Sequence, residues 1–123
     1  MTTKIYLTKG VKRWTKKHQL LEDQLINTVR EMEAGLSSAS LGGNIYKQPV
    51  ALRGRGKSGG ARTLIAARFG FRAIFLYGFE KNQRANISPK EEEALKAVAQ
   101  ELLGLTEKEI DIRSKNGALW RIQ

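Results

Sequence analysis

The side chains most able to do chemistry in this sequence are lysines and arginines in its central third. Arg62 opens an apolar stretch with the pattern of a β-strand, and Lys81 and Arg84 follow a second stretch of the same kind. Because only Gly70 and Phe71 separate the two stretches, we expect a tight hairpin that returns Lys81 and Arg84 to the end where Arg62 lies. The sequence therefore predicts a cluster of cations at one end of a β-sheet.

Such a cluster has the means to cleave RNA without a metal ion. The 2′-hydroxyl of RNA can attack the neighbouring phosphorus, so a catalyst has to position the strand, move protons and stabilise negative charge. Lysine and arginine supply most of these functions. Beside Arg62, the segment 53–60 carries Arg53, Arg55 and Lys57 at alternate positions, and we expect it to be a mobile basic loop that follows a phosphate backbone.

Other reaction classes fit this sequence less well. Residues 56–58 (Gly-Lys-Ser) resemble the end of a phosphate-binding P-loop, but Ala51 stands where that motif needs glycine, and the segment leads into a strand instead of a helix. His18 is the one histidine, which excludes a nuclease with a histidine pair, and we expect it at the surface. The acidic run 91–93 suits the first turn of a helix better than a metal ion. We expect neither a cofactor nor a metal.

Composition favours a basic cytoplasmic protein. The 123 residues fit a single domain, 1–123, and 22 Lys and Arg against 12 Asp and Glu leave a net charge of +10. This charge favours nucleic acid as a partner, because each phosphate that is neutralised releases a counterion, although an acidic protein or an anionic membrane surface could use the same charge. The chain has no cysteine and no apolar run that could cross a bilayer. We expect a cytoplasmic location and no membrane partner.

Hydrophobic periodicity predicts the elements around these cations. The expected strands are 4–7, 45–52, 61–69 and 72–79, the expected helices 11–18 and 20–36, and the expected loop 37–43. Ser88 and Glu91 form a capping box for a further helix, Thr106 opens a short one, and 118–122 is a candidate edge strand. We expect an α+β fold: an antiparallel sheet of about four strands, two N-terminal helices and a C-terminal helix, with one sheet face free for a ligand.

The central residues also resemble a known family. The stretches GRGKSGGART at 54–63, FLYGFEKN at 75–82 and RANIS at 84–88 are similar to the RelE/ParE superfamily of toxins from type II toxin–antitoxin systems, in its RelE/HigB-like branch. The resemblance covers most of the chain. It implies a RelE-like fold and ribosome-dependent cleavage of mRNA that needs no metal. It also implies three partners, which are a cognate antitoxin, the ribosome and mRNA.

The resemblance assigns roles to the cations. By matching positions, Arg62 is expected to contact the scissile phosphate, and Lys81 and Arg84 are expected to belong to the same patch. Together with Lys57 they are our candidate catalytic residues. The candidates for binding RNA or the ribosome are the basic side chains of the loop and of the first helix, namely Arg53, Arg55, Lys12, Arg13, Lys16 and Lys17.

The proton donor is the part of this site that the resemblance does not assign. Well-known members of the family have a catalytic tyrosine after the last strand, whereas this chain has Ser88 there, and Ser88 is needed as a helix cap. Tyr77 and Tyr46 are our candidates for the general acid.

Two other functions stay open at this point. A ParE-like inhibitor of DNA gyrase would share the fold, and it predicts inhibition of supercoiling without cut mRNA. A non-catalytic basic module that binds nucleic acid predicts salt-sensitive binding without cleavage. The dense group of basic residues beside Arg62 favours the nuclease.

Overall fold

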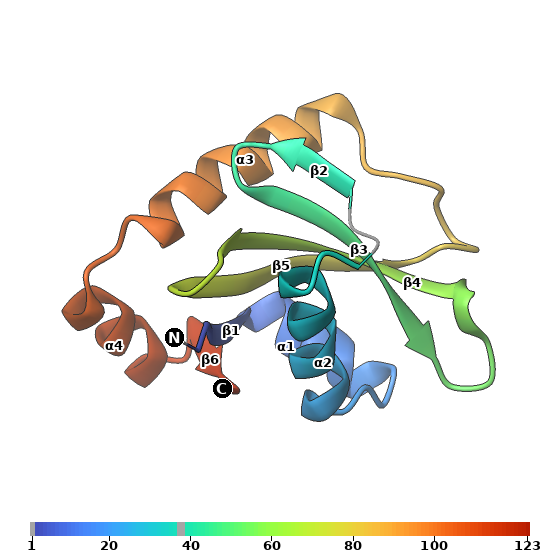
Figure 1. Cartoon of the computed structure of the whole chain (residues 1–123), viewed down its shortest axis with the longest axis horizontal. Helices are drawn as coiled ribbons and strands as arrows, with labels where there is room; N and C mark the ends of the chain where they lie inside the picture. The colour runs from blue at the N-terminus through green and yellow to red at the C-terminus, as the bar shows by residue number, and fades with distance from the viewer. Residues whose placement is uncertain (1, 37–38) are drawn as a thin grey trace.

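The computed structural model describes residues 2–36 and 39–123, which form four helices and one six-stranded sheet (Figure 1). The strands are β1 (Lys4–Thr8), β2 (Ala39–Gly42), β3 (Ile45–Leu52), β4 (Gly56–Arg68), β5 (Arg72–Glu80) and β6 (Leu119–Arg121). The helices are α1 (Lys9–Lys17), α2 (Glu22–Glu33), α3 (Pro89–Leu103) and α4 (Glu107–Lys115). The α+β class and the candidate edge strand near the C-terminus are confirmed, whereas the expected number of about four strands is too low.

The sheet is mixed, so the expectation of an antiparallel sheet is wrong. The strand order is β2-β3-β4-β5-β1-β6, and β1 runs parallel to β5, with Lys4 opposite Arg72 and Leu7 opposite Phe75. β1 is placed inside the sheet because its side chains are apolar on both faces, with Ile5 and Leu7 on one side and Tyr6 on the other. The sequences of β1 and β5 alone could not indicate that these two strands pair in parallel.

The β4–β5 hairpin is the centre of the sheet, as predicted. Its register runs from Arg68 opposite Arg72 to Ala61 opposite Glu80. The expected loop 53–60 is shorter than predicted, because pairing with β3 extends β4 back to Gly56 despite the low strand propensity of its glycines. Of the expected loop 37–43, residues 39–42 form β2, and 37 and 38 lie outside the described residues.

Helices cover both faces of the sheet, whereas one face was expected to be free. α1 and α2 pack on one face, where Val29 meets Ile65, and α3 and α4 pack on the other, where Leu102 meets Ile74 (Figure 1). The reason is that β4 and β5 are apolar on both sides, so each side has to be covered. The surface left for a ligand is therefore at an edge of the sheet instead of a face.

Arg72 is fully buried and joins the sheet to the two C-terminal helices. Its Nη1 donates to the carbonyls of Leu102, Leu103 and Leu105 at 3.0, 3.4 and 2.9 Å, and its Nη2 lies 3.2 Å from the carboxylate of Glu107. The carbonyls of Leu102 and Leu103 belong to the end of α3, where a helix lacks internal donors, and that of Leu105 directly follows the C-cap Gly104. Arg72 is thus a structural arginine.

Candidate functional site

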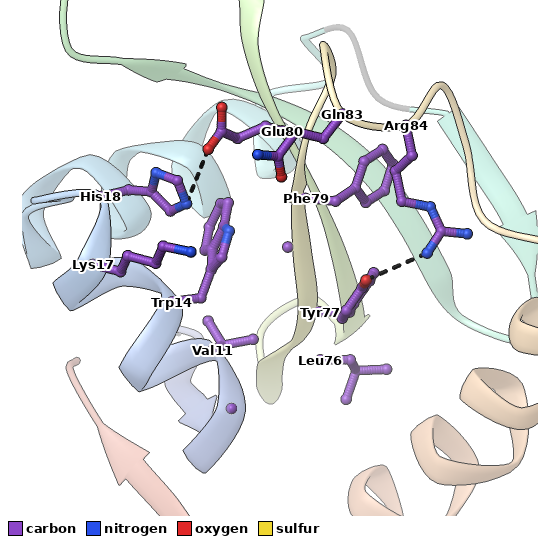
Figure 2. A pocket seen from close by; sticks show the side chains of 12 residues that line it. Val11, Trp14, Lys17, His18, Leu76, Tyr77, Phe79, Glu80, Gln83 and Arg84 are labelled. Atoms are coloured by element: carbon purple, nitrogen blue, oxygen red, sulfur yellow. Dashed lines mark hydrogen bonds and ion pairs between the residues drawn. The ribbon is translucent and has the colours of Figure 1, made fainter.

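A cleft of about 380 Å³ runs along the open edge of β5 (Figure 2). It exists because β1 pairs with β5 only as far as Phe75, after which Thr8 caps α1 by accepting a hydrogen bond from the Val11 N–H at 3.3 Å. The chain thereby turns away from the sheet. The cleft is lined by Gly10, Val11, Trp14, Lys17 and His18 of α1, by Leu76, Tyr77, Gly78, Phe79 and Glu80 of β5, and by Gln83 and Arg84.

Trp14 forms the α1 wall of the cleft and lies directly on the backbone of Gly78. A Cβ atom at position 78 would be 2.6 Å from two carbons of the indole, which is closer than packed atoms approach. One turn further along α1, the His18 ring lies 5.2 Å from the Trp14 ring. The absence of a side chain at Gly78 is therefore what allows α1 to approach the open edge.

Arg84 forms the opposite wall, where three side chains surround its guanidinium. It donates to both carboxylate oxygens of Glu91 at 2.6 and 3.1 Å and to the Tyr77 hydroxyl at 3.4 Å, and it lies 5.7 Å from the centre of the Phe79 ring. Hydrogen bonds to Glu91 and then Tyr77 raise the pKa of Arg84, while Arg84 and the Ser88 backbone lower the pKa of Glu91 to about 2. Tyr77 accepts its bond, so its own proton remains available to donate.

Arg62 and Lys81 lie at the same end of the hairpin as Arg84. Arg62 is opposite Phe79, and two residues further along the ladder the Lys81 N–H donates to the Gly60 carbonyl at 3.1 Å. Alternation along the strands puts positions 60, 62, 79 and 81 on one face. The Arg62 guanidinium is partly buried and donates to two carbonyls of its own strand, each at 3.1 Å. Three of the predicted cations thus lie at one end of the hairpin, where Arg84 lines the cleft and contacts Phe79, whereas Arg62 and Lys81 are not among the residues that line the cleft.

On the other side of β5, Glu80 contacts the side chains of Arg55 and His18. Its Oε2 accepts from Arg55 at 2.9 Å, and its Oε1 lies 3.4 Å from His18 Nε2 (Figure 2). The His18 side chain is only 13% exposed, so the expectation of a surface histidine is wrong. Trp14 and Glu80 cover it. Figure 2 shows the α1 side chains facing Tyr77 and Phe79 across the edge of β5.

Comparison with known proteins shows to which family this chain belongs. The family model described as RelE toxin of RelE / RelB toxin-antitoxin system matches residues 3–122. The chain belongs to the RelE toxin family. It is therefore a toxin of a toxin–antitoxin system, and membership implies an antitoxin partner. Neither the curated proteins nor the solved structures that were compared with it gave a match.

Two predicted site residues of this RelE-family toxin lie away from Arg84. Lys57 turns toward α2, where its ammonium binds both carboxylate oxygens of Glu31 at 2.9 and 3.2 Å. Tyr46 packs on the face covered by α1 and α2, with its ring 5.5 Å from that of Phe69. Of the two candidate general acids, Tyr77 is the one that lines the cleft.

The turn between β3 and β4 directs its two arginines toward α1. Arg53 donates to the side chain of Gln19 at 2.8 Å, and Arg55 pairs with Glu80 as described above. Both arginines are exposed to solvent, although the Glu80 side chain is only 11% exposed, so each arginine can still be reached by an anion. The turn can therefore contribute to a basic surface without reaching the cleft itself.

The four basic residues of α1 point in different directions. Lys17 lines the cleft, while Lys12 lies 4.3 Å from the centre of the Trp120 ring and 3.8 Å from the carboxylate of Glu22. Arg13 and Lys16 are exposed. Lys17 is the member of this group that is placed to contact a ligand in the cleft.

Neither a cluster of metal ligands nor a membrane-spanning helix occurs in the part of this RelE-family toxin that the structure describes. Among residues 2–36 and 39–123, no three His, Cys, Asp or Glu side chains come together as a metal site would require. None of the four helices described has the length and apolar character to cross a membrane.

Sequence reasoning missed most of the uncharged lining of the cleft. Trp14 and His18 are four residues apart, a spacing that places two side chains on one face of a helix. Gly78 stands alone between bulky residues of a strand, which indicates that another group approaches the backbone closely. These two signals together could have indicated the α1–β5 contact, although nothing in the sequence links α1 to this strand.

Proposed function

We propose that this RelE-family toxin is an endoribonuclease that cleaves mRNA on the ribosome without a metal ion. The observation that carries the proposal is that three cations, Arg62, Lys81 and Arg84, lie at the same end of the β4–β5 hairpin, next to the cleft that Arg84 lines. Clustered guanidinium and ammonium groups bind a phosphodiester through charge-assisted hydrogen bonds. Family membership supports the proposal, since RelE-family toxins are generally endoribonucleases.

The proposed reaction uses a nucleophile from the RNA itself. The 2′-oxygen forms a bond to the adjacent phosphorus as its proton leaves to solvent, and the bond from phosphorus to the 5′-oxygen of the next nucleotide breaks. The products are a 2′,3′-cyclic phosphate and a free 5′-hydroxyl. Arg62 and Lys81 hold the phosphate and stabilise its added negative charge.

Tyr77 is the proposed general acid. Its hydroxyl accepts a hydrogen bond from Arg84, which leaves the phenolic proton free for the departing 5′-oxygen. Arg84 is itself held by Glu91 and acts as a positioning residue for Tyr77. Tyr77→Phe is therefore expected to slow cleavage while RNA binding is retained.

The test is a cell-free translation reaction with purified toxin. Micromolar toxin is expected to stop protein synthesis and to leave mRNA fragments with cyclic phosphate ends. The same result is expected when a chelator removes transition metals but leaves the Mg²⁺ that ribosomes need. A single 2′-deoxy nucleotide at the cleaved position is expected to block the cut, because the nucleophile is then missing. Intact mRNA and normal translation at this concentration would contradict the proposal, and inhibition of DNA supercoiling instead would favour a gyrase inhibitor.

Arg62→Ala tests the site within this reaction. Removal of one group that stabilises transition-state charge commonly lowers the rate by about 10²–10³-fold, and we expect a loss of this size. Arg68→Ala is the matched control, because Arg68 is an exposed arginine at the other end of the same strand. Equal activity of the two variants would refute the assignment of Arg62.

A further inference from the structure

The proposed reaction uses Tyr77 and Arg84 but leaves the α1 wall of the cleft, and with it the slot between Trp14 and Tyr77, without a role. Trp14 closes it on the α1 side and Tyr77 on the other, as Figure 2 shows. The cleft as a whole has a volume of about 380 Å³, which lies within the range of roughly 300–1,000 Å³ that is usual for small-molecule pockets. Two aromatic walls favour a flat ligand.

The floor of the slot is the open edge of β5, whose backbone groups can recognise a ligand. Since the Lys81 N–H donates to the Gly60 carbonyl, alternation along the ladder directs the backbone groups of Phe79 toward β4 and those of Gly78 toward the open edge. A neighbouring N–H and C=O complement the donor and acceptor groups on the edge of a nucleobase. Gly78 lines the cleft, where the Trp14 indole lies against it and leaves only a small part of its backbone exposed.

The charges around the slot favour an anionic ligand. Lys17 lies on the α1 side. On the other side Arg84 is paired with Glu91, just as the carboxylate of Glu80 is bound by Arg55 and His18, so Lys17 is the main charge that faces a ligand. A nucleotide combines a flat base with phosphates, so it fits both the aromatic walls and the flanking cations. A peptide strand could also pair with the edge of β5, but it would make no use of these cations.

We infer that the slot binds one unpaired nucleobase of the RNA, in contact with Trp14 and Tyr77 and recognised by the backbone of Gly78. This inference rests on the proposed function, which takes RNA as the substrate. RNA then crosses the edge of β5, with one base in the slot and the neighbouring phosphate at Arg62. Trp14 becomes a binding residue, although it carries no charge.

Nucleotide binding by the full-length chain without ribosomes tests the inference directly. The chain has two tryptophans, so the variant Trp120→Phe leaves Trp14 as the sole tryptophan fluorophore. Each of the four nucleoside 5′-monophosphates is added, and ribose 5-phosphate serves as the probe that lacks a base. We expect saturable quenching of Trp14 by at least one nucleotide and none by ribose 5-phosphate at equal concentration. Equal quenching by ribose 5-phosphate, or no quenching by any nucleotide, overturns the inference.

Cleavage kinetics provide a second test. A base stacked on an aromatic side chain contributes affinity of about 5- to 150-fold, which corresponds to roughly 1–3 kcal/mol. Trp14→Leu is expected to raise the KM for mRNA by a factor in this range and to change kcat less. Trp120→Leu is the matched control, because Trp120 lies outside the cleft. A KM equal to that of the control overturns the inference.

A surface variant covers the case in which Trp14→Leu fails to fold. Lys17 is exposed, so Lys17→Ala keeps the fold, and we expect it to weaken nucleotide binding several-fold. Lys108→Ala on α4 removes the same charge away from the cleft and is expected to leave binding unchanged. Equal affinities of these two variants overturn the inference. Cleavage of mRNA without nucleotide binding refutes this inference alone, whereas nucleotide binding without cleavage refutes the proposed function alone.

Discussion

Replacement of Arg72 by methionine is expected to destabilise the protein without altering the cleft. Methionine has a similar length and no charge, so it removes the bonds from Nη1 to the carbonyls at the end of α3 and the pair with Glu107. Leu102 O retains a donor, because the Leu105 N–H also points to it at 3.4 Å. The carbonyls of Leu103 and Leu105 lose the donor that Arg72 supplied.

The size of the effect follows from these groups. A buried carbonyl without a donor costs about 1–3 kcal/mol, so the two carbonyls together cost about 2–6 kcal/mol. The variant regains about 1–2 kcal/mol, because it removes a buried charge. It also removes the Arg72 Nε, which has no hydrogen-bond partner among the described residues. The net loss is about 3 kcal/mol. For a chain of this length it corresponds to a fall in Tm of about 10 °C.

Urea unfolding followed by circular dichroism measures this loss. Arg68→Met is the control, because Arg68 lies opposite Arg72 on β4 and also contacts Phe71, but is exposed. The control is expected to change the free energy of unfolding by less than about 0.5 kcal/mol. Equal losses for the two variants would refute the reasoning, since they would show that the carbonyls of α3 find other donors when Arg72 is absent.

Two further predictions concern the walls of the cleft. Glu91→Gln is expected to lower Tm at pH 7, and the difference in Tm from the wild type should shrink as the pH falls from about 4.5 toward 2. The reason is the lowered pKa of Glu91, which makes its pair with Arg84 stabilising above this pH range, whereas below it the pair is lost. A difference in Tm that does not change with pH would contradict this prediction. Gly78→Ala should cost about 1–3 kcal/mol by displacing Trp14, whereas Gly10→Ala, where a Cβ meets no atom within 4 Å, should be neutral or stabilising in the same thermal unfolding measurement. Similar Tm values for the two glycine variants would exclude the close contact between Gly78 and Trp14.

Local features of this chain could be predicted from the sequence. The start of α3 depends only on residues that are close in the sequence, since Ser88 and Glu91 exchange hydrogen bonds of 3.1 and 2.8 Å across three residues. The β4–β5 hairpin is similar, because two apolar stretches separated by a short turn have few other ways to pair. The hairpin in turn determines that Arg62 and Lys81 lie at the same end of the sheet.

The identity of the site residues depended on contacts between distant parts of the chain. Arg62 and Arg72 are arginines on neighbouring strands, and only the position of the end of α3 makes Arg72 structural. Likewise, Glu31 of α2 binds Lys57 away from the cleft, whereas Glu91 of α3 holds Arg84 beside it. Charge and spacing cannot predict such pairs, because each depends on how a helix packs on the sheet.

The cleft itself was decided by the tertiary structure alone. It exists because β1 pairs in parallel with β5 and ends at Thr8, which leaves Leu76–Glu80 without a strand on that side in the described part of the chain. Parallel pairing of these strands joins residues almost 70 positions apart. The sequence by itself determined a basic α+β chain with cations at one end of a hairpin, because composition and local pairing are sufficient for that, and its resemblance to a known family indicated a toxin. Which of those cations lie beside the cleft depended on long-range packing.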